Sequence, residues 1–305
     1  MPTAGLVRVH RASMISDAVP RRITLAGVEP LLVQSIYRSV INITTADGLL
    51  TVTREGGGLP NGIVADLGPD WRVIGLRPGM VAVAGDATLR VPDAGLEIEF
   101  AGASRWSPRL AASAELADAA GARWKRRTAA TRAVARARAS AGGFGPLLRE
   151  DVASGPDSCM DVARPALAAL IDALEMGDRR RAAETATRLI GLGQGLTPSG
   201  DDVLVGIEAA LHALAQPTAG FVALATGGVE ARTTALAATL LRHAAAGEFA
   251  QRLHVLLATL LGSDDEAIPA AIDRAVAWGA TSGTDCLLGV LVGLDVAAGV
   301  HRALD

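Results

Sequence analysis

The chain has 305 residues, of which 50% are hydrophobic, 20% charged and 3% aromatic, and its net charge is −3. This composition allows a large core of Ala, Leu and Val without disulfides, and the near-neutral charge argues against nucleic acid and anionic membranes as partners. Because the sequence holds two cysteines and no membrane-spanning or secretory pattern, we expect a cytoplasmic protein.

Residues 1–106 predict a β-rich N-terminal domain, either a sandwich or a small barrel. Short apolar runs alternate there with turn signals such as Ala46-Asp47-Gly48 and Arg77-Pro78-Gly79, and this alternation is typical of such folds. The glycine-rich residues 56–62 form either a long hairpin loop or a segment that reaches the helical domain. The expected strands are residues 31–36, 49–52, 63–65, 80–83 and 96–98.

Residues 107–305 predict a mainly α-helical C-terminal domain, so the expected fold class is α+β. Apolar periodicity marks the helices, and residues such as Asp178 and Gly191 mark their ends. Residues 142–155 are expected to form a flexible seam. The expected helices cover residues 108–141, 160–175, 179–190, 200–214, 231–246, 248–261, 264–278 and 283–298.

Two stretches of the helical domain share the pattern S-G-x-D-x-L-x-G, which we call the twin motif. The copies occupy residues 199–206 and 282–289, and Thr197 and Thr281 lie just upstream of them. Ser and Thr hydroxyls cap helix starts, and a glycine in the first turn lets another group approach closely. We therefore expect two helix N-termini that together form one site for a small anion. Its residues would include Ser199, Gly200, Ser282 and Gly283.

A glycine-rich loop precedes the first copy of the twin motif. Gly193 and Gly195 lie in the segment GLGQGLTPSGDD, which could offer several backbone N–H groups to an anion. The alternative is a tight helix–helix turn. A Walker loop is excluded because the segment has no lysine, and a dinucleotide fingerprint is excluded because a helix rather than a strand precedes it.

The aspartates of the twin motif allow three interpretations. They could favour the helix dipole, ligate a divalent ion or act as a base. Asp202 and Asp285 hold the same position in the two copies, so we favour them as a functional or structural pair. Asp201 is adjacent and points about 100° away. We expect no cofactor, with a divalent metal at Asp202 and Asp285 as the alternative.

A third segment, Arg232-Thr233-Thr234, opens a predicted helix. Arg232 could hold a carboxylate or phosphate through its bidentate guanidinium, or it could be a surface arginine beside capping threonines. The basic stretch from Arg123 to Arg138 contains one aromatic residue, Trp124. We therefore interpret it as a solvated helix face rather than a nucleic-acid surface.

These segments resemble the AllH family, which is associated with oxamate carbamoyltransferase in allantoin and purine degradation. The resemblance rests on GLGQGLTPSGDDVLVG, ARTTAL, the step Gly247-Glu248 and GATSGTDCLLG, with LPNGIV in the β-rich part. It implies carbamoyl transfer between carbamoyl phosphate and oxamate, with oxalurate as the carbamoylated partner. It also implies further subunits. The positions that match are Gly193, Gly195, Thr197, Ser199, Gly200, Asp201, Asp202, Arg232, Thr233, Thr234, Thr281, Ser282, Gly283 and Asp285.

Three hypotheses follow. In the first, the chain is a carbamoyltransferase subunit in which Arg232, Asp202 and Asp285 are catalytic and the remaining matched positions bind the anionic substrate. In the second, it is a non-catalytic partner subunit whose glycine-rich turns serve assembly. In the third, Asp202 and Asp285 hold a metal in a hydrolase or lyase.

Overall fold

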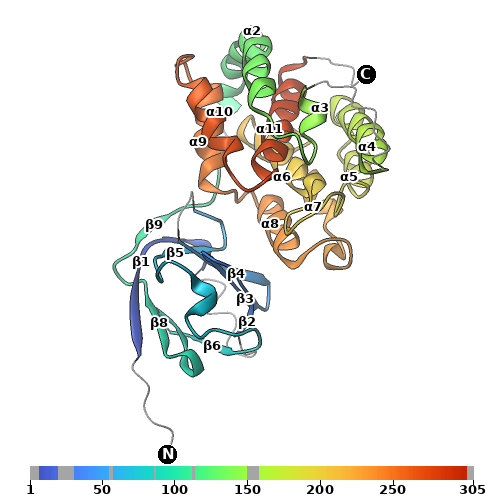
Figure 1. The fold of residues 1–305 in the computed structure, drawn as a ribbon. Helices are drawn as coiled ribbons and strands as arrows, with labels where there is room; N and C mark the ends of the chain where they lie inside the picture. Colours follow the sequence, from blue (N-terminus) through green and yellow to red (C-terminus); the bar gives the residue numbers. More distant parts are fainter. Residues whose placement is uncertain are drawn as a thin grey trace, which may run out of the picture. The chain divides into compact units, whose positions relative to one another are not determined.

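The computed structural model describes residues 7–19, 31–54, 58–85, 87–111, 114–149 and 158–300. Two compact units divide the chain, Met1–Pro108 and Arg109–Asp305. The first is a β-barrel and the second is helical, which confirms the α+β prediction (Figure 1).

The first unit is a closed barrel of strands β1–β8. The strands follow the order β5-β4-β3-β2-β6-β7-β8-β1, and β1 also pairs with β5, which closes the ring. β9 pairs in parallel with the end of β1. The bounds are β1 Arg8–Ser16, β2 Leu31–Ile36, β3 Val40–Thr45, β4 Gly48–Thr53, β5 Gly62–Ala65, β6 Val81–Ala84, β7 Thr88–Val91, β8 Leu96–Glu99 and β9 Ser104–Trp106.

The five predicted strands are β2, β4, β5, β6 and β8. The described part of the chain also contains β1, β3, β7 and β9, which the sequence analysis did not predict because these segments contain many polar residues. β3, for example, buries Asn42, whose side chain donates to Ser35 and accepts from Thr51. A buried amide is tolerated there because these cross-strand partners satisfy it.

The loop before β5 is not a hairpin. β4 and β5 pair in parallel, so the hairpin prediction for residues 56–62 is wrong. Residues 56 and 57 lie outside the described residues. Gly58 packs so closely on the Trp106 ring that a Cβ would overlap it, and the buried Asn61 side chain donates to Leu49 O at 2.8 Å. These contacts fix the loop across the end of β4.

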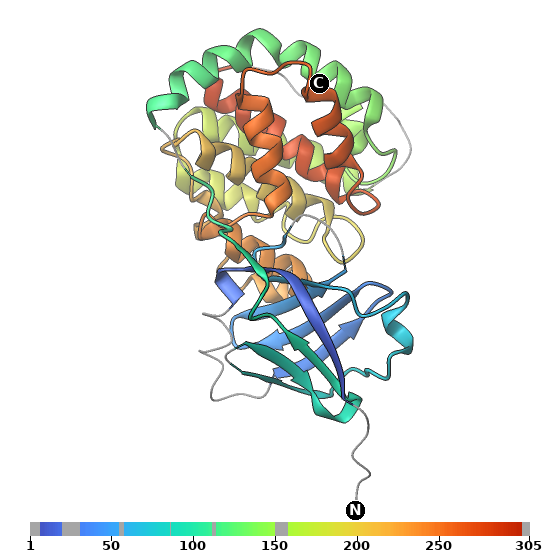
Figure 2. The same cartoon turned by 90° about the vertical axis from the view of Figure 1, so that its left-hand side faces the viewer.

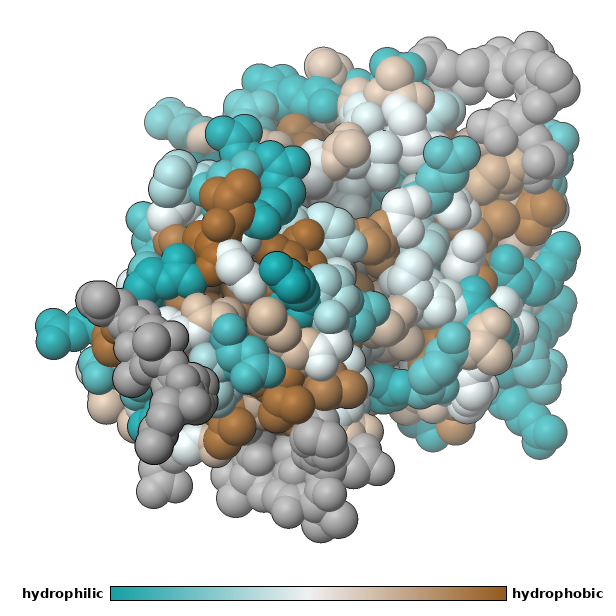
Figure 3. All heavy atoms as spheres, turned by 60° about the horizontal axis from the view of Figure 1, so that its bottom comes forward, coloured by the Kyte–Doolittle hydropathy of each residue, from teal (hydrophilic) through white to brown (hydrophobic). Residues whose placement is uncertain are grey.

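The barrel also exposes apolar side chains on its outer surface. Leu32 of β2 lies directly opposite Val81 of β6, and both are exposed, as are Val9 and Val83. On the face shown in Figure 3, hydrophobic groups are interrupted by hydrophilic ones.

The helical unit is built around the packed pair α6 and α11. α2 runs along one face of the unit (Figure 2) and contacts α9, α10 and α11. None of the helices in the described residues is long and apolar enough to cross a membrane. The bounds are α2 Ala114–Arg138, α3 Gly145–Arg149, α4 Ser158–Glu175, α5 Arg179–Ala186, α6 Ser199–Ala213, α7 Phe221–Ala225, α8 Ala235–Ala245, α9 Gln251–Leu261, α10 Ile268–Val276 and α11 Ser282–Ala298.

The basic stretch on α2 is not simply a solvated face. Arg132 is buried and forms an ion pair with the buried Asp295 of α11 at 2.6 Å. Arg127 is also buried and pairs with Asp265 at 2.6 Å. The sequence interpretation is therefore wrong at these two positions, because α2 packs on α9, α10 and α11 through the same face that carries them.

The predicted seam at residues 142–155 is packed where it is described. Phe144, Leu147 and Leu148 are buried, and residues 145–149 form the short helix α3. Residues 150–155 lie outside the described residues. The flexible-seam prediction is thus wrong for residues 142–149, because its apolar side chains join the core of the helical unit.

Candidate functional site

The last glycine of each twin-motif copy lies where α6 and α11 cross. A Cβ on Gly206 would overlap the carbonyl oxygen of Cys286, and one on Gly289 would overlap that of Val203. The Cα atoms of these glycines therefore allow the two helix backbones to touch. This crossing brings the two copies of the motif together.

The second residue of each copy has an equivalent packing role. A Cβ on Gly200 would overlap the carbonyl oxygen of Leu189, and one on Gly283 would overlap that of Ala275. The Gly200 N–H donates to Leu192 O at 2.8 Å, and the Gly283 N–H donates to Trp278 O at 2.9 Å. These two N–H donors, which the sequence assigns to an anion, are occupied by protein carbonyls.

The expected threonine caps are absent. Pro198 is the N-cap of α6, and Thr281 is the N-cap of α11 without a side-chain cap bond. Instead, the Thr197 and Ser282 hydroxyls hydrogen-bond each other at 2.7 Å. The capping prediction is wrong because the Thr197 hydroxyl bonds to Ser282 of the other helix, and the Thr281 side chain contacts the Asp285 carboxyl group instead of a backbone N–H. The predicted proximity of the two termini is confirmed.

Two buried aspartates lie beneath these hydroxyls in a reciprocal arrangement. Asp202 of α6 contacts the side chains of Thr197 and Ser282, and Asp285 of α11 contacts those of Ser199 and Thr281. Each carboxyl group thus meets the threonine before its own helix and the first serine of the other. We call this set of six residues the α6–α11 junction.

Burial dominates the electrostatics of this junction. It raises the pKa of Asp202 well above its ordinary value, and the neighbouring Asp285 charge raises it further. Burial also raises the pKa of Asp285, while the backbone N–H of Phe144, which donates to its Oδ1 at 2.7 Å, lowers it. Oδ2 of each carboxyl group is buried without a well-aligned hydrogen-bond partner in the described part of the chain. Burial therefore favours the protonated form of both carboxyl groups more than water does.

Cys286 joins the junction from α11. It is buried, and its thiol donates to Asp202 Oδ1 at 3.8 Å. Burial raises the pKa of this thiol well above its ordinary value, as do the adjacent aspartates. The residue is therefore a neutral thiol rather than a nucleophilic thiolate.

Asp201 belongs to a separate cluster between α6 and α8. Its Oδ1 accepts from Gly191 N at 3.0 Å, and its Oδ2 accepts from the Thr233 hydroxyl. Burial raises its pKa to about 6. The adjacent aspartates thus serve different clusters, as the helical spacing predicts. This cluster fixes the loop after α5 against the start of α8.

Arg232 lies in the Asp201 cluster and not at the junction. Its Nη2 donates to Ala225 O at 2.6 Å and to Gly227 O at 2.8 Å, carbonyls at and beyond the end of α7. Thr234 is the N-cap of α8, accepts from Ala237 N and donates to Leu196 O. These contacts favour a structural role for the Arg232 segment.

The glycines of the loop before α6 have left-handed backbones. Gly191, Gly193 and Gly195 have φ values of 76°, 117° and 98°, and residues other than glycine rarely adopt such angles. A Cβ on Gly193 would also approach Ser199 N to 2.7 Å, whereas Gly195 has open space around it. Gly195 and Leu196 are exposed, so this loop borders the junction on its solvent side.

The Gly247-Glu248 step is structural as well. Glu248 does not begin α9, and its Oε2 lies 2.7 Å from Nδ1 of the buried His243 ring. Gly247 has a φ of 72° and lies beside the His212 ring. No group of three or more His, Cys, Asp or Glu side chains suited to a metal ion occurs among the described residues.

Sequence reasoning missed Arg252. This residue lies in the first turn of α9, with its guanidinium carbon 3.5 Å from the centre of the Trp278 ring. A cation in the first turn opposes the helix dipole. This unfavourable position was the signal in the sequence that Arg252 has a role other than stabilising its helix.

The buried carboxyl groups of α6 predict how stability depends on pH. Burial raises the pKa of Glu208 to about 7 from 4.5. Between these values the folded state holds a proton that the unfolded state lacks, so stability falls as the pH rises from about 5 to 8. Thermal melts should show a higher Tm at pH 5.5 than at pH 8. Glu208→Gln should reduce this difference, and an unchanged difference would contradict the assignment.

The fold and site define a two-unit protein in which a closed barrel precedes a helical unit centred on two duplicated helix starts. Residues 189–294 match the family model described as oxamate carbamoyltransferase subunit AllH, and residues 11–105 match the AllH family N-terminal domain. The chain therefore belongs to the AllH family. No curated protein and no solved structure gives a significant match.

Proposed function

We propose that the chain is a subunit of an oxamate carbamoyltransferase and that the α6–α11 junction supplies its proton-transfer groups. The family match supports the reaction class. The observation that carries the assignment of the site is the pair Asp202 and Asp285, both buried with raised pKa values and in contact with hydroxyls of the two helix starts.

The proposed reaction needs both an acceptor and a donor of protons. The oxamate nitrogen attacks the carbonyl carbon of carbamoyl phosphate, the bond from that carbon to the phosphate oxygen breaks, and the nitrogen loses a proton. The products are oxalurate and phosphate. A carboxyl pair that holds one proton can accept the proton from nitrogen through its ionised member and donate to the departing phosphate through its protonated member. Neutralisation by that held proton also limits repulsion of the anionic substrates.

The hydroxyls of the junction can position the substrates. Thr197 and Ser282 are half-buried, whereas Ser199, Asp202 and Asp285 are buried. A substrate that displaces the mutual hydrogen bond of Thr197 and Ser282 would receive two hydroxyl contacts next to the carboxyl pair. Holding the reacting atoms in this way supplies a large part of the rate in such transfers.

A non-catalytic assembly role is the competing proposal. The occupied N–H groups of Gly200 and Gly283 favour it, since a preformed anion site would leave them free. In that role the twin motif fixes the shape of the helical unit, and residues on other subunits perform the transfer. A complex with other subunits is part of both proposals, in keeping with the description of the family as a subunit.

Substitution of Asp202 distinguishes these proposals. In the reconstituted complex, we expect Asp202→Asn to lower the rate of oxalurate formation from carbamoyl phosphate and oxamate by about 10²-fold or more, because a general acid–base group is lost. The matched control is Glu208→Gln, which alters another buried carboxyl group on α6. Equal rates for both variants, with both folded and assembled, would support the assembly role instead.

A further inference from the structure

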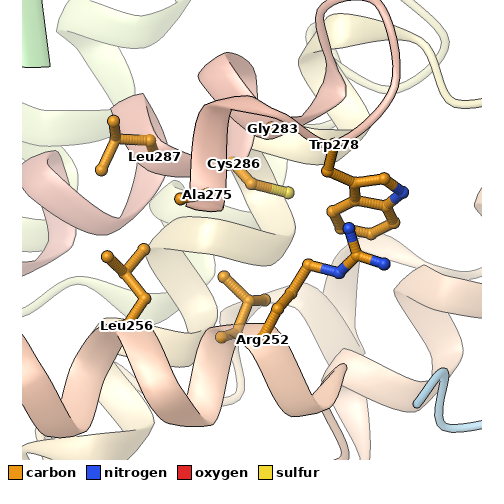
Figure 4. A pocket seen from close by; sticks show the side chains of 8 residues that line it. Arg252, Leu256, Ala275, Trp278, Gly283, Cys286 and Leu287 are labelled. Atoms are coloured by element: carbon orange, nitrogen blue, oxygen red, sulfur yellow. The ribbon is translucent and has the colours of Figure 1, made fainter. Parts of the chain in front are cut away.

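A small recess opens beside the junction, between α9, the end of α10 and the start of α11. Its free space is about 10 Å³, enough for about one water molecule. Figure 4 shows Arg252 against the Trp278 ring, with the Cys286 side chain directed toward the same space. The lining residues are Arg252, Leu253, Leu256, Ala275, Trp278, Gly283, Cys286 and Leu287.

The charge of Arg252 has no counterion among the described residues. Its Nε is buried without a hydrogen-bond partner there, and burial lowers the pKa of its guanidinium to about 10, which leaves it charged at neutral pH. Stacking on Trp278 uses the face of the guanidinium. Its N–H groups lie in the plane and keep the fork geometry that matches a carboxylate.

Two helix starts add to the positive potential of the recess. Arg252 is the second residue of α9, and Gly283 is the second residue of α11. The N-terminal end of each helix carries a partial positive charge. A bound anion would offset the repulsion between the guanidinium and these two helix ends. The rest of the lining is largely apolar, which would strengthen the attraction to an anion.

We propose that this recess binds the carboxylate of a small oxyanion through Arg252. The proposal deepens the function proposed above, in which that carboxylate belongs to oxamate. A planar carboxylate matches the guanidinium fork and needs less added room in the recess than a tetrahedral phosphate does. Modest movement of the Arg252 and Trp278 side chains, both half-buried, would admit it.

Cys286 lies between the recess and the carboxyl pair. Cys286 lines the recess and donates to Asp202, and Gly283 directly follows Ser282 of the junction. A carboxylate held at Arg252 would therefore leave the other end of the same small molecule near Ser282 and Asp202. Arg252 would take the charge-neutralising role that the sequence assigned to Arg232.

Calorimetric titration of the full chain tests the recess directly. We expect oxamate to bind, neutral oxamide to bind at least tenfold more weakly, and inorganic phosphate to compete poorly. Arg252→Gln should weaken oxamate binding at least tenfold, and Arg252→Lys should weaken it less. The matched control is Arg180→Gln, which alters an exposed arginine of α5 that pairs with Glu184.

A fluorescence titration gives a second readout that does not depend on the folding of an Arg252 variant. Oxamate should change the emission of the wild-type chain, and Trp278→Phe should remove that change. The inference is overturned if the wild-type chain does not bind oxamate, if oxamide binds equally well, or if a folded Arg252→Gln variant binds as tightly as the wild type. Asp202→Asn should keep oxamate binding, so loss of transfer and loss of binding are separate outcomes.

Discussion

Asp295→Ala is expected to lower the free energy of unfolding of the helical unit by between about 3 and 5 kcal/mol. Asp295 is buried on α11 and accepts four hydrogen bonds from α2. These are Trp124 Nε1 at 2.7 Å, Thr128 Oγ1 at 3.0 Å, and Arg132 Nε and Nη2 at 3.0 and 2.6 Å. Removing the carboxylate leaves the buried Arg132 charge and two buried donors without this partner.

Urea unfolding followed by circular dichroism at 222 nm would measure this loss. Asp273→Ala is the matched control, because Asp273 of α10 forms an ion pair with Arg138 of α2 at an exposed position. Such pairs contribute about 1 kcal/mol or less. If the two variants lost similar stability, the Asp295 cluster would not be the main polar link between α2 and α11.

Gly200→Ala is the second large effect that we expect. Its new Cβ would overlap the carbonyl oxygen of Leu189, and this backbone atom cannot move aside as a flexible side chain could. The start of α6 would have to shift, at a cost of about 3 kcal/mol. The same shift would displace Ser199 and Asp202, so transfer activity in the complex should fall together with stability.

A glycine in open space provides the comparison for Gly200. Gly227 is exposed and has nothing within 4 Å of the position of a Cβ, so Gly227→Ala should change the free energy of unfolding by less than about 0.5 kcal/mol. A small effect of Gly200→Ala in the same unfolding measurement would show that close packing is not the reason for glycine in the twin motif.

The sequence predicted those parts of the fold that depend on local patterns. Strands β2 and β8 and helices α4, α6 and α11 follow apolar periodicity, and Asp178 caps α5 as expected, by accepting from Arg181 N. The shared frame of the twin motif also indicated that the two helix starts would lie together, and the Thr197 and Ser282 hydroxyls do meet at 2.7 Å.

The remaining features depend on tertiary contacts. Thr197 could cap its own helix or bond to Ser282, and only the crossing of α6 and α11 decides between them. Arg132 looks like any surface arginine until α2 packs on Asp295. Arg252 meets Trp278 and Cys286 only when α9, α10 and α11 assemble. Arg232 was chosen for its chemistry, but its donors are turned toward the carbonyls of Ala225 and Gly227.

The crystal structure of the chain soaked with oxamate tests the central claim most directly. We predict that oxamate lies between Arg252 and the α6–α11 junction, with its carboxylate on the guanidinium and its amide end within hydrogen-bonding distance of Ser282 or Thr197. Oxamate bound elsewhere, for example at the surface groove beside Arg180 and Thr187, with the junction unchanged, would contradict the account.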